Sequence, residues 1–141
     1  MANNLQLSTA ARAGLLDAIE TAGGATAKMK IFSAAQPTSC SAVDPAGALA
    51  AFTLPTDWMS GASAAGNVVT KVFITGAGWT TTASAAGTAA SFRIYANDGT
   101  TCHIQGTCGA TTGYDLNFDN PVLATSQTVT ISGFTLTAPN A

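Results

Sequence analysis

The first apolar pattern along the chain has the spacing of a helix. Apolar residues recur every four positions, and two more widen the same stripe: Ala11, Leu15 and Ile19, with Leu16 and Ala22. Ser8 is suited to cap the start of such a helix, and Gly23-Gly24 is suited to end it. The pattern therefore predicts a helix over residues 9–22.

An extended arm is expected before this helix, over residues 1–8. Leu5 and Leu7 alternate there with polar residues. Short terminal segments of this kind often become ordered only when they dock on a partner. The arm is therefore a candidate contact segment.

After Gly24 the apolar period changes to two, which is typical of β-strands. The pattern predicts about eight short strands, over residues 27–33, 48–54, 68–75, 79–83, 91–96, 101–107, 114–118 and 127–137. The hairpin over residues 91–107 carries the clearest local signal. Phe92 and Ile94 alternate there with polar or amphipathic residues, and Asn97-Asp98-Gly99 is suited to a tight turn.

The last predicted strand changes phase partway along. Val129 and Ile131 share one face, whereas Phe134 and Leu136 fall on the other, with Ser132-Gly133 between them. A β-bulge inserts one residue and re-aims the side chains that follow, so we expect one here. Together the patterns predict a single domain over residues 1–141. It would be a mostly β, antiparallel β-sandwich of jelly-roll type with one N-terminal helix.

The scarcity of charge is the most informative feature of the composition. Charged residues make up 9% of the 141 residues, against about 25% in typical soluble domains. Either partners cover much of the surface, or Thr, Ser and Asn solvate it. The net charge is −2 and the five Lys and Arg residues are scattered, so we expect no nucleic-acid binding.

Membrane and secretion signals are not expected either. No stretch approaches the roughly 18 apolar residues of a membrane span. The first residues lack the basic and apolar regions of a secretory signal. We therefore expect synthesis in a cytoplasm and no membrane association.

Three cysteines, Cys40, Cys102 and Cys108, cannot all pair within one chain. Cys102 and Cys108 would lie about 20 Å apart in one extended strand, which is too far for a disulfide. A turn between them, or Cys40 brought across, would change that. Free buried thiols are the expectation we favour.

The residues offer little for catalysis or metal binding. His103 is the single histidine, and Cys102 beside it would point to the opposite face of a strand. The close cysteine spacing of a zinc site is missing. Asp115 and Asp119 lie near a strand end, where an exposed strand position explains Asp115 and turn chemistry explains Asp119. We expect no enzyme activity, no cofactor and no metal.

Several segments resemble one family of virion proteins. They are residues 5–12 with 16–20, residues 53–59, the pair 92–95 and 99–106, and the closing 128–137. These segments are similar to the cement (decoration) proteins on the capsids of tailed bacteriophages. The resemblance implies a jelly-roll-like fold and a homodimer on the capsid exterior. It also implies the major capsid protein as partner, assembly in the bacterial host and no catalytic residues.

For such a protein, the candidate partner interface comprises apolar residues of the arm and helix, with two tryptophans ranked second: Leu5, Leu7, Leu15, Leu16, Ile19, Trp58 and Trp79. The helix residues would alternatively pack on their own domain. The tryptophans would alternatively stack on sugars, although aromatic anchors are the commoner role. The competing function is a carbohydrate- or receptor-binding β-sandwich of a phage tail, or a minor structural protein of the tail.

Overall fold

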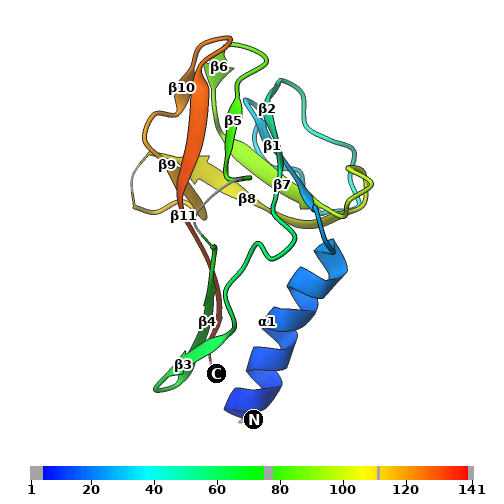
Figure 1. Ribbon diagram of the computed structural model, residues 1–141, viewed down its shortest axis with the longest axis vertical. Coiled ribbons are helices and arrows are strands. Elements are labelled where there is room, and N and C mark those ends of the chain that lie inside the picture. Colours follow the sequence, from blue (N-terminus) through cyan, green and yellow to red (C-terminus); the bar gives the residue numbers. More distant parts are fainter. Residues whose placement is uncertain (1–4, 75–77, 111, 140–141) are drawn as a thin grey trace.

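The computed structural model describes residues 5–74, 78–110 and 112–139 (Figure 1). These residues form a leading helix and eleven strands. In chain order they are α1 (Thr9–Gly23), β1 (Lys28–Phe32), β2 (Ala48–Thr53), β3 (Ser63–Ala65), β4 (Val68–Val72), β5 (Thr80–Thr82), β6 (Gly87–Thr88), β7 (Ser91–Tyr95), β8 (Cys102–Gly109), β9 (Leu116–Phe118), β10 (Val122–Leu123) and β11 (Thr128–Pro139).

The elements divide into two regions, which we call the body and the stem. The body holds β1, β2, β5 to β10 and residues 128–134 of β11. The stem holds α1, β3, β4 and residues 135–139 of β11, and it projects from one end of the body (Figure 1). The helix begins at the far end of the stem and runs toward the body, where β1 starts.

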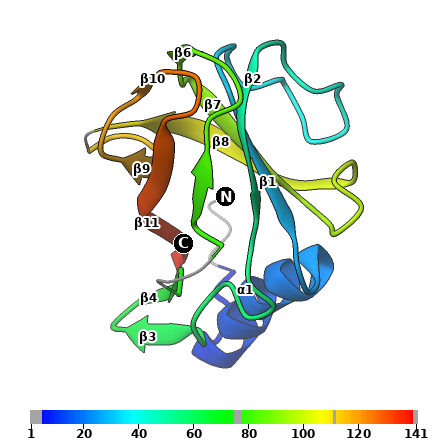
Figure 2. The same ribbon diagram turned by 45° about the horizontal axis from the view of Figure 1, so that its top comes forward.

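Nine strands form one large sheet whose main order is β2-β1-β7-β8-β9-β11-β4-β3, with β5 also paired to β11. The pairs are antiparallel except β8 with β9, which run parallel. The sheet curls until β5 returns toward β2 (Figure 2). There the Thr81 hydroxyl donates to the Ala51 carbonyl at 2.8 Å, and the Ser84 amide donates to the Leu49 carbonyl at 2.8 Å.

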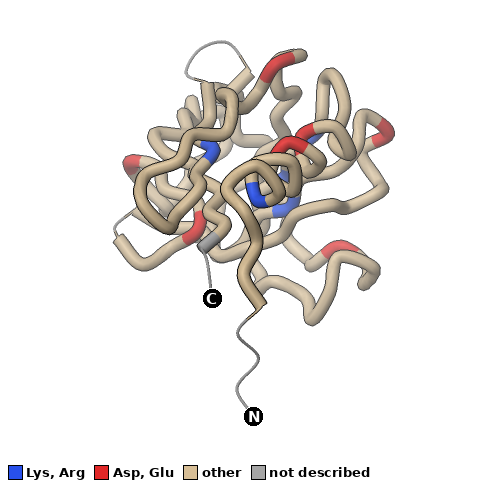
Figure 3. The backbone as a smooth tube through the Cα atoms, turned by 90° about the horizontal axis from the view of Figure 1, so that it is seen from below, with Lys and Arg blue, Asp and Glu red and all other residues tan. Residues whose placement is uncertain are grey.

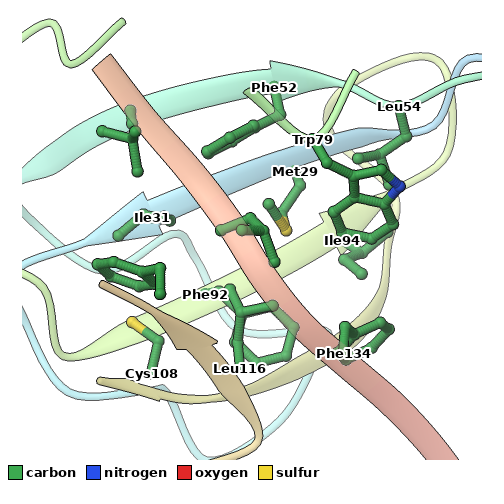
Figure 4. Packing of buried hydrophobic residues seen from close by; sticks show 14 of the residues in the cluster. Met29, Ile31, Phe52, Leu54, Trp79, Phe92, Ile94, Cys108, Leu116 and Phe134 are labelled. Carbon is green, nitrogen blue, oxygen red and sulfur yellow. The ribbon is translucent and has the colours of Figure 1, made fainter. Parts of the chain in front are cut away.

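The apolar core lies inside this curled sheet. Figure 4 shows side chains of β1, β2 and β7 on one side and the β11 ribbon crossing them on the other. The rings of Phe92 and Phe134 meet edge-on at 5.7 Å between centroids. Because alternate residues of each strand face inward, the period-two pattern accounts for this arrangement.

Several expectations are confirmed. The chain is mostly β, with 42% strand and 12% helix. The hairpin of β7 and β8 forms, with Gly99 in the left-handed region at φ 69°. The register of β11 against β9 shifts between Ile131 and Gly133, where the bulge was predicted. The two-sheet jelly roll is not confirmed, because most strands join one mixed sheet. The short strands β3, β6 and β10 were not predicted.

The helix is confirmed over nearly its predicted length, but a different face is buried. Ser8 accepts a hydrogen bond from the Ala11 amide as the N-cap, and Gly24 follows the last turn at φ 70°. The buried row is Arg12, Leu16 and Gly23 rather than the apolar row of Ala11, Leu15 and Ile19. Polar partners on the stem sheet explain this rotation of the helix.

Candidate functional site

The far end of the stem exposes large apolar side chains. Leu5 is 76% exposed, Leu7 43% and Leu15 55%. The first two precede the helix and the third lies on its outward face, so they extend over the arm and the outside of α1. A buried leucine is stabilised by about 1.5–3 kcal/mol relative to an exposed one. This surface, which we call the leucine surface, therefore gains free energy if a partner covers it.

A guanidinium holds the other face of the helix against the stem sheet. Arg12 is buried, and its Nη1 donates to the Asn67 carbonyl at 2.5 Å and the Ala138 carbonyl at 3.1 Å. Leu16 lies one turn further along, and Val69 of β4 is also fully buried. Because Arg12 reaches across to both β11 and the turn before β4, it fixes which way the helix faces.

A lysine of β4 fixes the second half of the helix. The Lys71 Nζ lies 2.6 Å from Asp17 Oδ1 and 2.8 Å from Glu20 Oε2, and the lysine side chain is nearly fully buried. Glu20 also accepts from the Trp58 and Met59 amides through Oε1. Burial opposes the lysine charge, but its bonds to Asp17 and Glu20 outweigh this and raise the pKa of Lys71 above 10.5.

The structure corrects part of the predicted interface. Leu16 is buried against the stem sheet and Ile19 is half-buried, so neither extends the leucine surface as Leu15 does. Trp58 and Trp79 are wholly buried and are not available for surface contacts. The aromatic signal was read correctly as that of anchors, but the anchors belong to this chain's own core.

The environment of Trp79 shows why it is buried. Its ring meets Phe73 edge-on at 5.1 Å and lies 6.2 Å from Phe134. Sugar-binding sites use exposed aromatic faces on which a ring can stack. Neither tryptophan presents such a face.

The basic residues are all engaged within the chain. Arg12, Lys71 and Arg93 have the partners described in this section. Lys28 donates to the Thr53 hydroxyl at 2.8 Å, and Lys30 pairs with Asp44 at 3.0 Å. Figure 3 shows several acidic positions on outlying loops. Because the Lys and Arg side chains bind partners within the chain, few charged groups remain free to interact with water at the surface.

A second polar cluster holds the 33–47 loop, which joins β1 to β2, over the outer face of β7. Arg93 is buried and donates to three carbonyls of the loop, those of Ser39, Cys40 and Ala42. It also pairs with Asp44 at 2.9 Å, and the Tyr95 hydroxyl donates to the same carboxylate at 2.5 Å. Sequence reasoning missed this cluster. The signal was present in Arg93 and Tyr95, the two polar or amphipathic residues that alternate with Phe92 and Ile94.

Asp44 is the shared acceptor of this cluster. Burial opposes its ionisation, but bonds from Tyr95, Lys30 and Arg93 outweigh this and lower its pKa below 3.8. Burial and the bond to Asp44 raise the pKa of Tyr95 well above its ordinary 10.0. Both shifts favour the charge states in which the loop stays attached.

Two further acidic residues have structural partners. Asp115 accepts from the Thr107 amide and hydroxyl, and Asp98 accepts from the amides of Thr100 and Thr101 in the hairpin turn. His103 is exposed on β8. Among the described residues, no three His, Cys, Asp or Glu side chains are grouped so as to hold a metal ion.

One open hollow of about 430 Å³ lies at the junction of helix and body. It is lined by Asp17, Glu20, Thr21, Gly24, Ala25, Thr56, Asp57 and Lys71. Its lysine and two of its carboxylates already bind one another. The hollow is therefore part of how the stem is held.

Comparison of the chain with known protein families, with curated proteins and with solved structures finds no match. Within the described residues, α1 is too short and too polar for a membrane span, and no other helix qualifies. The leucine surface remains an exposed apolar feature of the described structure.

Proposed function

We propose that this chain is a structural protein of a tailed-phage virion, a cement protein that binds the outside of the capsid and clamps major capsid protein subunits. The observation that carries the proposal is the leucine surface on a projecting stem. Leu5 and Leu7 are exposed before α1 and Leu15 is exposed on α1, which belongs to the stem that projects from the body (Figure 1). The resemblance of the sequence to cement proteins supplies the identity of the partner.

The geometry suits a clamp. The body is a stable mass held by its own core, and the stem presents apolar side chains at a distance from it. A capsid offers many equivalent sites, so a modest affinity per site yields a large total resistance to subunit separation. A homodimer would place two stems on one lattice, and we propose that state for the bound protein. The function needs neither a cofactor nor a catalytic group.

Binding to capsid shells tests the contact surface. In the variant Leu5→Ser/Leu7→Ser/Leu15→Ser, each substitution removes an apolar side chain that binding would bury. Loss of about 1.5 kcal/mol or more at each position weakens binding at least tenfold per leucine. The assay mixes purified protein with shells of the major capsid protein encoded beside it, and measures the bound fraction by sedimentation.

The matched control replaces two exposed valines of the body, Val43→Ser and Val122→Ser, which are 88% and 59% exposed. They remove exposed apolar side chains from the body and leave the stem unaltered. Equal loss of binding in both variants would contradict the stem contact. No binding of the unaltered protein to shells would overturn the cement function.

Location in the particle separates the cement function from its rival. Cryo-electron microscopy of virions should show density for the protein spread over the capsid lattice. Density confined to the tail would favour a minor tail protein or a host-recognition module instead. Heat stability gives a second readout, because particles lacking the protein should release DNA at a lower temperature.

A further inference from the structure

Two of the three cysteines are brought together by the loop that Arg93 holds. Phe92 and Ile94 of β7 point into the core, so Arg93 and Tyr95 occupy the opposite, outer face (Figure 4). Tyr95 is the cross-strand neighbour of Cys102 on β8. Cross-strand neighbours share a face of the sheet, so Cys102 lies on this outer face beneath the 33–47 loop.

Cys40 lies on the loop directly above. The Arg93 Nη2 donates to the Cys40 carbonyl at 2.8 Å, and the Cys102 thiol lies near enough to the same guanidinium to raise the pKa of Arg93. Burial and, to a smaller extent, the adjacent Cys40 thiol raise the pKa of Cys102 to about 11. Both cysteines are half-buried and both are free thiols in this structure. They therefore form a neighbouring pair at the edge of the loop.

Cys108 does not belong to this pair. It is buried in the core among the side chains of Figure 4, and burial alone raises its pKa to about 12. It also follows Cys102 on the same strand at a separation of about 20 Å, beyond disulfide reach. The fold thus separates one inert thiol from two that lie beside the same Arg93 and Tyr95.

We propose that Cys40 and Cys102 form a reversible disulfide that locks the 33–47 loop onto the outer face of β7 and β8, with a small-molecule disulfide such as oxidised glutathione as the oxidant. This site is independent of the capsid role. The bond would close a loop of roughly 60 residues, and long closures constrain the unfolded chain strongly. It would add a covalent link to the contacts that Arg93, Tyr95 and Lys30 make with the loop.

The exchange proceeds in two balanced steps. The Cys40 thiolate attacks one sulfur of oxidised glutathione, forms a mixed disulfide and expels one glutathione thiolate. The Cys102 thiol then gives its proton to solvent, and its sulfur attacks the Cys40 sulfur and expels the second glutathione thiolate. The two cysteines lose two electrons, and oxidised glutathione becomes two reduced glutathione molecules after each thiolate takes up a proton.

Mass spectrometry tests the bond. Trypsin cuts after Lys30, Lys71 and Arg93, which leaves Cys40 in fragment 31–71 but Cys102 and Cys108 together in fragment 94–141. The variant Cys108→Ala removes that ambiguity. After incubation with excess oxidised glutathione at pH 8, we expect its mass to fall by roughly 2 Da and fragments 31–71 and 94–141 to be joined.

The unaltered protein is treated in parallel, and one thiol should then titrate in denaturant. Two free thiols in the treated Cys108→Ala protein, glutathione retained on each cysteine, or a link between two chains would overturn the proposal. These measurements use only the unaltered protein and Cys108→Ala, so no other variant has to fold.

The locking role has its own measurement. Oxidation of Cys108→Ala should raise its melting temperature by roughly 10 °C. It should also slow amide exchange in the 33–47 loop at least tenfold, and dithiothreitol should reverse both. The matched control, Cys40→Ser/Cys108→Ala, should change in neither readout. If the disulfide between Cys40 and Cys102 forms but the melting temperature and the amide exchange of the 33–47 loop stay unchanged, the locking role is overturned.

Discussion

The body and the stem are stabilised by different interactions. The body encloses a continuous cluster of 21 buried apolar residues from the strands and the segments between them. The stem contributes no fully buried member to this cluster, and only its Leu136 packs against it. Its contact between helix and sheet buries Leu16 and Val69 together with two charged residues, Arg12 and Lys71.

The difference explains why one region is rigid by packing and the other is specified by polar contacts. Apolar burial is non-directional, so the body gains stability from area alone. Arg12 and Lys71 each lose their hydrogen bonds to water when they are buried. Bonds to protein groups replace them only where Asn67, Asp17 and Glu20 lie at hydrogen-bond distance. The stem therefore has one well-defined helix orientation, with less stabilisation than the body.

Removing a body side chain should have the largest effect. Phe92→Ala leaves a cavity beside Phe134 in the core, and such changes cost about 3–5 kcal/mol. We expect the whole chain to lose stability, because both regions depend on the body. Urea unfolding followed by tryptophan fluorescence measures it, since Trp58 and Trp79 are buried. A loss below about 1 kcal/mol would show that the body is not the main source of stability.

Two adjacent leucines of the helix test which face is buried. Leu16→Ala should cost about 3 kcal/mol, because Leu16 is buried against the stem sheet. Leu15→Ala should cost less than about 0.5 kcal/mol, because Leu15 is largely exposed. Both variants have the same helix propensity change, so urea unfolding isolates burial. The reverse order would mean that the helix faces the other way.

Breaking the lysine network should loosen the stem and spare the body. Lys71→Ala leaves Glu20 and Asp17 without their cation, and we expect a loss of about 2 kcal/mol, reduced from a fully buried pair because Asp17 is half exposed. Lys71→Met keeps the volume and should lose less. Hydrogen exchange should rise in α1 and β4 but not in β7. A uniform rise across both regions would contradict separate stabilisation.

Alkaline pH should weaken the body through its buried thiol. Burial raises the pKa of Cys108 from 9.0 to about 12, so its neutral form is favoured in the folded state. The stability it contributes is complete below pH 9 and is lost as the pH rises toward 12. At pH 10 the loss is about 1 kcal/mol.

The variant Cys108→Ala serves as the control for this pH effect. Its stability should fall less between pH 8 and pH 10 than that of the unaltered protein. Urea unfolding at the two pH values gives the difference. An equal loss of stability in the two proteins would show that Cys108 does not titrate as a buried thiol. Lys71 and Tyr95, whose pKa values are also raised, lose their contributions at higher pH in both proteins.

Local signals in the sequence predicted the local features. The β7–β8 hairpin depends on alternation and on Asn97-Asp98-Gly99, the helix start depends on Ser8, and the bulge depends on Ser132-Gly133. In each case the residues that determine the structure are neighbours in sequence. The short strands β3, β6 and β10 escaped because β3 contains only Ser and Ala, and β6 and β10 have two residues each, so none shows an apolar alternation.

Long-range partners decided what the sequence did not reveal. The buried face of the helix follows Arg12 and Glu20, whose partners Asn67 and Lys71 are distant in sequence. Periodicity groups the apolar residues on one stripe, but the hydrogen bonds of Arg12 and the ion pair of Glu20 with Lys71 turn Arg12 and Leu16 toward the stem sheet. Leu15 of the apolar row is exposed and belongs to the leucine surface, whereas Leu16 beside it is buried. Of the residues predicted for a partner interface, Leu5, Leu7 and Leu15 are exposed, Ile19 is half-buried, and Leu16, Trp58 and Trp79 are buried.

Strand β11 joins the two regions as one uninterrupted backbone. Its first half pairs with β5 and β9, and its second half pairs with β4. A force applied to the stem along this strand would travel through covalent bonds into the middle of the body. The ladder hydrogen bonds on both sides would then be loaded in shear, many at once, instead of being unzipped one by one. A molecule built in this way resists tension along its long axis more than peeling from its edge.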